Sequence, residues 1–363
     1  MTPTSRGALR TALAGAAVVA TAISISACSS GGSSTSSEET SASGAADYGT
    51  LALQLSWIKN EEFCGEFFAD SEGYYTDAGF TEVKMTSGPS TGAAELISGS
   101  AEVALSDAVS TGSVVASEGA PLKIIATTYQ KNPFTVLSLK SGGNIATPQD
   151  LVGKTIGVQD SNTALFNAFL AANGLESGDG DDQVHIVPVQ YDPAPLTKGE
   201  VDGFIAYLTN EAITVAAQGV ETTNLPFADN GLPFVAETIT TTDDMIANSR
   251  EELKAFLVAE IKGWTDCVND PEAGAKLAVE DYGKDLDLDL TNSVAGATEQ
   301  AEALVTSDET EANGLFTISE TLQADTITSL AGAGVTLTAD QLFDMSLLAE
   351  VYQEHPELVD YAG

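Results

Sequence analysis

The chain has 363 residues, and its 53 Asp and Glu against 14 Lys and Arg give a formal net charge of −39. A surface this acidic repels nucleic acids and anionic lipid headgroups, which excludes proteins that bind either through charge. About 315 residues follow the N-terminal leader described next, enough for two lobes rather than one.

The N-terminus has the pattern of an export signal. Arg6 and Arg10 form a basic start, and residues 12–27 are small, apolar and uncharged. That run is too short and too poor in large residues to span a membrane. The motif Ile-Ser-Ala-Cys at 25–28 resembles a bacterial lipobox, in which the cysteine is lipidated and begins the mature chain. We therefore predict a lipidated Cys28; the alternative is an ordinary secretory signal with a chance cysteine.

The segment after the signal is predicted to be a tether. Residues 28–47 are almost wholly Ser, Gly, Thr, Glu and Ala, which cannot bury an apolar core. With residues 1–27 removed as a lipoprotein signal peptide, the protein would be anchored by lipid alone to the extracytoplasmic face of the cell membrane.

Two cysteines remain after Cys28. Outside the cell, Cys64 and Cys267 can form a disulfide or stay as two buried thiols. Both alternatives stay open here, because pairing depends on their separation in space. No CxxC, HExxH or similar metal-ligand spacing occurs, and we expect neither a metal nor a cofactor.

Predicted strands and helices alternate from about residue 50 onward. Short apolar runs predict strands at 51–57, 83–85, 103–106, 122–129 and 134–139, with helices around 63–67, at 93–97 and at 113–118. A second series follows a capped turn at Thr147-Pro148, with strands at 155–158, 184–189 and 203–207 and helices at 164–172 and 211–218. Such alternation predicts parallel sheets flanked by helices.

The last third of the chain is predicted to be mostly helical. A strand at 234–240 can carry the chain back to the first unit. Capping boxes are expected at Ser249 with Glu252 and at Thr338 with Gln341, and Asp270-Pro271 begins another helix.

The predicted fold is α/β, with two lobes around a cleft, two hinge crossovers and a helical C-terminal part. Residues 48–135 and 236–363 would form lobe 1, and residues 136–235 lobe 2. In open α/β sheets, ligands bind beyond the carboxyl ends of the strands, which places the site in the cleft.

Short motifs run in a distinctive order between about residues 50 and 240. They are WIKN and GYY at 57–60 and 73–75, AGF at 78–80, LISGSAEVA at 96–104, GAPLK at 119–123, DLVGKTIGV at 150–158 and KGEVDG at 198–203. Each is weak alone, but the ordered series resembles the thiamine-pyrimidine and sulfonate-type solute-binding family of ABC importers. The helical C-terminal third matches only in general character.

This resemblance implies a type II periplasmic-binding-protein fold that closes by hinge motion. It also implies a small-molecule solute, and an ABC permease and ATPase as partners. We expect a monomeric binding lipoprotein that touches the membrane only through its anchor, binds no nucleic acid and is not an enzyme.

Four candidate ligand residues lie in lobe 1. Trp57 stands where the family places an aromatic residue, and a flat ring in a cleft suits a flat heteroaromatic ligand; the alternative is a core tryptophan. Asn60 can bond a ring nitrogen or shape a turn. Asp107 can reach the ligand or cap a helix. Ser90 belongs to a Gly/Ser turn that is expected to line the cleft, with Ser90 or Thr91 capping the next helix.

The other candidates lie in lobe 2, after predicted strands. Helix-start N–H groups favour polar acceptors, and side chains beside them can bind the ligand or only cap the helix. Glu211 can accept bonds from an exocyclic amine or simply favour a helix first turn. The lobe 2 candidates are Ser161, Asn162, Thr163, Tyr207, Asn210 and Glu211.

Ligand identity is ranked by charge and ring chemistry. Few basic residues lie near the proposed site, which disfavours sulfonates. Trp57 with Glu211 fits an aminopyrimidine, so a thiamine pyrimidine precursor ranks first. Riboflavin ranks second, because segments 63–69 and 130–134 resemble riboflavin-type binders of this family, and a sulfonate such as taurine ranks third.

The competing class is a secreted serine hydrolase. Residues 88–92, Gly-Pro-Ser-Thr-Gly, match the GxSxG nucleophile motif between a strand and a helix. His185 or His355 would have to serve as the base for Ser90. Only about 40 folded residues precede Ser90, which leaves little room for the usual strands and oxyanion loop. The hydrolase is therefore the less favoured interpretation.

Overall fold

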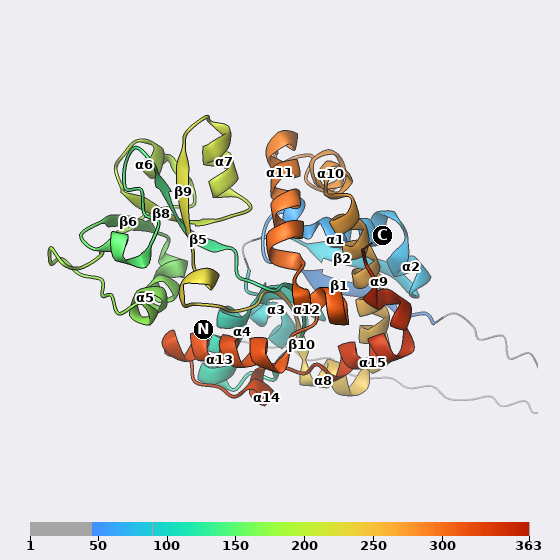
Figure 1. Ribbon diagram of the computed structural model, residues 1–363. Helices are drawn as coiled ribbons and strands as arrows, with labels where there is room; N and C mark the ends of the chain where they lie inside the picture. Colours follow the sequence, from blue (N-terminus) through green and yellow to red (C-terminus); the bar gives the residue numbers. More distant parts are fainter. Residues whose placement is uncertain (1–45, 89, 363) are drawn as a thin grey trace, which may run out of the picture. The chain divides into compact units, whose positions relative to one another are not determined.

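Two mixed five-stranded sheets carry the fold of the computed structural model, which describes residues 46–88 and 90–362 (Figure 1). These residues form one compact unit. The predicted signal peptide, the lipidation site Cys28 and nearly all of the predicted tether lie outside the described residues.

The first sheet has the strand order β2-β1-β3-β10-β4. Strand β1 pairs in parallel with β2 and β3, whereas β10 runs antiparallel to β3 and β4. The strands are β1 (Gly49–Gln54), β2 (Phe80–Thr86), β3 (Val103–Asp107), β4 (Leu122–Tyr129) and β10 (Ala236–Thr242).

The second sheet has the order β7-β6-β8-β5-β9. Strand β6 is parallel to β7 and β8, and β5 is antiparallel to β8 and β9. The strands are β5 (Phe134–Leu139), β6 (Thr155–Val158), β7 (His185–Pro188), β8 (Gly203–Tyr207) and β9 (Thr222–Pro226).

The sequence predicted parallel sheets, but both sheets are mixed. The two crossovers explain the difference. The chain leaves the first sheet at the end of β4, enters the second as β5 after four residues, and returns between β9 and β10. A strand that arrives directly from the other sheet enters at the edge where the parallel strands end, so it must run against them. The α/β class and the two crossovers are confirmed. The lobe boundaries stay a prediction, and the one at 135/136 falls inside β5.

Helices flank both sheets (Figure 1). Those of the first two thirds are α1 (Cys64–Ser71), α2 (Tyr74–Asp77), α3 (Ala93–Ser98), α4 (Ala108–Glu118), α5 (Thr163–Ala172), α6 (Ala194–Thr197) and α7 (Glu211–Ala217). Short 3₁₀ turns are η1 (Glu61–Phe63), η2 (Pro148–Leu151), η3 (Asp160–Asn162) and η4 (Ala228–Asn230).

The last third is helical, as predicted. It contains α8 (Asp243–Asn248), α9 (Arg250–Asn269), α10 (Pro271–Lys276), α11 (Leu290–Gln300), α12 (Asp308–Asn313), α13 (Glu320–Gly332), α14 (Ala339–Leu342), α15 (Ser346–Glu354), π-helical turns at Leu277–Tyr282 and Ala301–Val305, and a final 3₁₀ turn at Pro356–Val359. The capping box at Thr338 is confirmed, whereas the Ser249 side chain makes no capping bond to α9. No helix among the described residues is long and apolar enough to cross a membrane.

Cys64 and Cys267 form a disulfide, which decides between the two alternatives left open by the sequence. Their Cα atoms are 5.9 Å apart, and both residues are fully buried. The bond joins α1 to α9 inside the largest apolar core, where Phe63, Phe67 and Trp264 also pack. This core supports the segment between β1 and α1, which carries part of the site described below.

Candidate functional site

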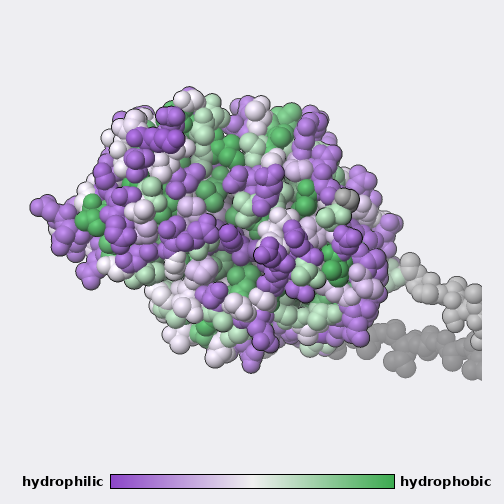
Figure 2. All heavy atoms as spheres, viewed as in Figure 1, coloured by the Kyte–Doolittle hydropathy of each residue, from purple (hydrophilic) through white to green (hydrophobic). Residues whose placement is uncertain are grey.

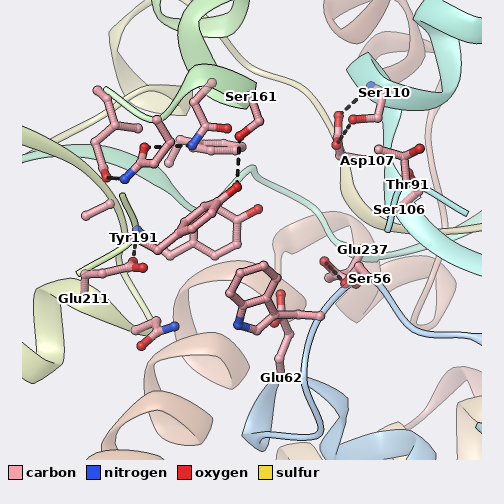
Figure 3. A pocket seen from close by; sticks show the side chains of 18 of the residues that line it. Ser56, Glu62, Thr91, Ser106, Asp107, Ser110, Ser161, Tyr191, Glu211 and Glu237 are labelled. Atoms are coloured by element: carbon pink, nitrogen blue, oxygen red, sulfur yellow. Dashed lines mark hydrogen bonds between the residues drawn. The ribbon is translucent and has the colours of Figure 1, made fainter. Parts of the chain in front are cut away.

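A cavity of about 330 Å³ lies between the two sheets (Figure 3). Its walls come from the carboxyl ends of β1, β3, β6 and β8, from the loop after β7 and from the starts of β5 and β10. This is the position expected for a ligand in open α/β sheets. The lining residues are Ser56, Trp57, Glu62, Ser90, Thr91, Ser106, Asp107, Ser110, Phe134, Gln159, Ser161, Asn162, Tyr191, Ile205, Ala206, Tyr207, Asn210, Glu211 and Glu237.

The cavity combines aromatic rings with carboxyl groups. Four lining residues are aromatic and four are acidic, and no Lys, Arg or His is among the described residues that line it. Hydrophilic residues also cover much of the molecular face seen in Figure 2. A solute bound here would meet stacking surfaces and hydrogen-bond acceptors, without a cation to neutralise an anionic group.

Two of the carboxyl groups form a buried pair. Glu62 and Glu237 are 8% and 6% exposed and are hydrogen-bonded to each other. The Ser56 hydroxyl donates to Glu237 Oε2 at 3.0 Å. Burial raises the pKa of Glu62 to about 7, and burial with the nearby charge of Glu62 raises the pKa of Glu237 well above its ordinary value. Each of the two carboxyl groups therefore holds its proton more tightly than an exposed glutamate does.

The backbone aims Glu237 into the cavity. Its φ is +45°, and the pairing of β10 with β3 shifts register between Ala236 and Thr238. Such an irregularity redirects a side chain that would otherwise follow the alternation of the strand.

Asp107 caps a helix while it lines the cavity. Its Oδ1 accepts from the backbone N–H groups of Val109 and Ser110 at 2.8 and 2.9 Å, and its Oδ2 accepts from the Ser110 hydroxyl at 2.6 Å. The capping alternative is thus confirmed for this residue. Its carboxylate is already engaged and has less capacity left for a solute.

Replacing Asp107 with alanine is therefore expected to lower the free energy of unfolding by about 1 kcal/mol, because two helix-start N–H groups lose their acceptor. Urea denaturation of the solute-free protein measures this. Asp107→Asn is the matched control and should lose less than half as much, since an asparagine oxygen can still cap. Unchanged stability of Asp107→Ala would show that the cap contributes nothing.

Glu211 lies at the opposite wall. Its Oε2 accepts from the Tyr207 backbone N–H at 2.8 Å, and burial raises its pKa. The carboxylate also accepts from the backbone N–H of Glu211 itself, and the side chain lines the cavity (Figure 3). It can therefore both support the β8–α7 turn and accept a bond from a solute.

Aromatic rings meet across the cavity. The Trp57 and Tyr191 ring centroids are 5.2 Å apart at an interplanar angle of 57°, and the Tyr191 and Ser161 hydroxyls are 3.0 Å apart. Phe134 and Tyr207 make an edge contact at 4.8 Å. Trp57 itself lies in the loop after β1, which ends at Gln54 rather than at the predicted Trp57.

Most sequence-predicted site residues are brought together by the structure. Those that line the cavity are Trp57, Ser90, Asp107, Ser161, Asn162, Tyr207, Asn210 and Glu211. Two do not. Asn60 lies at a second cavity, and Thr163 begins α5 with its hydroxyl bonded to the Gln159 carbonyl at 3.4 Å.

Sequence reasoning missed several lining residues, above all Glu62, Tyr191 and Glu237. The sequence could have indicated Tyr191 as a site residue, because it follows a predicted strand at the same sheet edge as Ser161. Glu62 is close to the predicted Trp57 and Asn60 but resembled an ordinary helix-start acid. No pattern in the sequence around Glu237 indicated that its side chain would line the cavity.

Ser90 has a structural role in its turn. Its hydroxyl donates to Glu95 Oε2 at 3.0 Å and accepts from the Gly92 N–H at 3.1 Å. The chain has two histidines, His185 in β7 and His355 after α15, and neither lines the cavity. The hydrolase interpretation therefore lacks the base that it requires.

Known proteins resemble this chain in sequence and in fold. Residues 60–274 match the family model described as NMT1/THI5 like. Riboflavin-binding protein RibY from Chloroflexus aurantiacus is 26% identical over 245 residues, which are 63% of this chain and 66% of the relative. The aligned region thus spans about two thirds of that relative's length.

Solved structures share the fold at low identity. The aliphatic sulphonate-binding protein SsuA from Escherichia coli has a TM-score of 0.58 at 14% identity, covering 80% of this chain and 95% of that one. The nitrate-binding protein NrtA from Synechocystis has a TM-score of 0.60 at 14% identity, covering 85% and 90%. These neighbours establish the type II periplasmic-binding-protein fold. Since the family model spans more than half of the sequence, the chain belongs to the NMT1/THI5-like family.

Proposed function

We propose that this protein is the solute-binding component of an ABC importer, held at the extracytoplasmic face of the membrane by a lipidated Cys28. It captures a flat heteroaromatic solute that carries hydrogen-bond donors and delivers it to a permease driven by an ATPase. Family membership and fold support the importer role, and the lining of the cavity supports the solute class.

The observation that carries the solute class is the pairing of aromatic rings with acidic groups. Trp57 and Tyr191 offer faces for a flat ring, and Glu62, Glu211 and Glu237 offer acceptors. A sulfonate or nitrate ion would approach these carboxyl groups without a basic residue to bind it, which is unfavourable in a partly desolvated site. A neutral or cationic ring with N–H groups avoids that cost.

Riboflavin is now the first candidate, and an aminopyrimidine precursor of thiamine is the second. Both have a flat ring with N–H donors, so the cavity chemistry alone does not separate them. The relative named for riboflavin binding favours riboflavin. This reverses the order that the sequence suggested.

The proposed mechanism is capture by closure. A solute stacks on Trp57 in the first half, and Ser161, Asn162, Tyr207 and Glu211 in the second half close over it by hinge motion at the two crossovers. The closed form docks on the permease, and no covalent bond is made or broken.

Titration with riboflavin, a hydroxymethyl-aminopyrimidine, taurine and nitrate tests the proposal. We expect one heteroaromatic solute to raise the melting temperature, since a ligand at about 100 times its Kd adds about 2.7 kcal/mol to the stability. Taurine and nitrate should produce no shift. A shift with taurine or nitrate alone would overturn the solute class, and no shift with any of the four would overturn the binding role.

A further inference from the structure

A second cavity, of about 260 Å³, lies beside the first. Three segments far apart in sequence enclose it: the loop after β1, the start of α7 and the start of α11. Figure 1 shows α7 and α11 as neighbours, although they belong to the middle and the last third of the chain. The lining residues are Ile58, Asn60, Glu61, Thr209, Asn210, Ile213, Thr214, Asp287, Leu288, Asp289, Asn292 and Ser293.

The two cavities differ in chemistry. The second has no aromatic residue among its described lining, and most of its polar groups are amide, hydroxyl or carboxyl. It therefore offers no stacking surface, but it offers many hydrogen-bond acceptors. Such a lining suits hydroxyl or amine groups rather than a second flat ring.

The two cavities adjoin each other. Asn210 lines both of them, and two pairs of chain neighbours, Trp57 with Ile58 and Glu61 with Glu62, place one residue in each. Asn210 stands directly before α7, but its side chain makes no capping hydrogen bond. Its amide is thus free to bond a solute that extends from one cavity to the other.

The second cavity contains one buried acceptor that has no donor among the described residues. Asn60 is 5% exposed, and its Oδ1 has no hydrogen-bond partner. A buried acceptor without a donor costs about 1–3 kcal/mol. Glu61 beside it is 8% exposed, and burial raises its pKa to about 7. A donor-bearing group in the cavity would satisfy Asn60 Oδ1, whereas the Glu61 carboxyl group already accepts from the Ser293 side chain.

We propose that the second cavity is a subsite for the hydroxyl- or amine-bearing end of a solute whose flat ring occupies the first cavity, with Asn210 contacting both parts. The inference rests on the proposed function and deepens it, because it requires a solute with a ring and a polar tail. Riboflavin has this form, with a polyol chain attached to its ring system. A small aminopyrimidine would fill the first cavity alone.

Thr214→Phe tests the subsite, because Thr214 lines the second cavity and not the first. The probes are riboflavin and lumichrome, which has the same kind of ring system without the polyol chain. We expect the variant to weaken riboflavin binding roughly tenfold, as filling the subsite removes several hydrogen bonds. Lumichrome binding should change less than twofold. Fluorescence titration of the full-length protein gives both dissociation constants.

Two further variants keep the test decisive. Thr214→Val preserves the shape of the side chain and should leave riboflavin binding within about threefold, the effect of one lost hydrogen bond. If Thr214→Phe does not fold, as judged by its melting curve, Asn292→Leu takes its place, since Asn292 also lines only the second cavity.

The outcomes separate the subsite from the proposed function. Equal riboflavin affinity in the filled variant and the unmodified protein would overturn the subsite but not the function. Equal weakening of riboflavin and lumichrome would also overturn it, because the substitution would then act on the ring site. If the unmodified protein failed to bind riboflavin, the proposed solute would fall, and the subsite with it.

Discussion

Trp57→Ala is expected to weaken binding of the heteroaromatic solute roughly tenfold to a hundredfold, because ring stacking on an aromatic side chain contributes about 1–3 kcal/mol. The half-buried indole lies in the loop after β1, at the edge of the largest core. The fold should therefore survive its removal, with only a small change in melting temperature. Fluorescence or calorimetric titration measures the affinity.

The second tryptophan of the chain provides the matched control. Trp264 is 1% exposed and packs in the core between α1 and α9. Trp264→Phe should lower the melting temperature but leave the dissociation constant within about twofold, because its indole is remote from the solute. If Trp57→Ala bound the solute as tightly as the unmodified protein, the cavity between the sheets would not be the binding site.

The free energy of unfolding is expected to fall as pH rises from about 5 to 8, and Glu66 should be a main cause. Glu66 is fully buried in the core, and burial raises its pKa from 4.5 to about 7. The folded state therefore binds this proton more tightly than the unfolded state. The resulting stabilisation is fully present below pH 4.5 and is lost as pH rises through 7.

Glu66→Gln should reduce the fall in the free energy of unfolding between pH 5 and pH 8 by about 2–3 kcal/mol. This is the contribution expected over that range from a pKa raised from 4.5 to about 7. Its neighbours Glu260 and Tyr75 share a 2.5 Å hydrogen bond and remain in the variant, so part of the slope should persist. Urea denaturation at pH 5 and pH 8 measures the difference. Glu82→Gln, at an exposed position of β2, should leave the slope unchanged.

An unfolding free energy that rises between pH 5 and pH 8, or equal slopes for the unmodified protein and Glu66→Gln, would contradict this account. The first result would mean that the folded protein stabilises buried acids such as Glu66 and Glu260 in their charged form. The second would mean that Glu66 keeps an ordinary pKa despite its burial.

Much of the fold could be predicted where local pattern decides it. Strands β4, β5, β6 and β8 have the predicted bounds, because each is a short run of apolar or β-branched residues between turn signals. Strand β9 was missed. It lies at the edge of its sheet with only Leu225 buried, so its sequence shows little alternation.

The predicted part of the site consists mainly of residues at or shortly after the ends of strands, such as Trp57, Asp107 and Asn162. Their position beyond a strand end is visible in sequence, and the fold gathers strand ends at one place. Glu237 could not be found in this way. It lies within β10, and only the register shift beside it, a product of pairing with distant β3, turns its carboxyl group into the cavity.

The Cys64–Cys267 bond has a topological consequence. It closes a covalent ring that spans 203 positions and includes the whole second sheet together with both crossovers. A protease that cuts once anywhere within this ring leaves a single covalent molecule, whose two fragments separate on a gel only after reduction. A single cut at either crossover, where closure is proposed to occur, would thus release neither half of the candidate site.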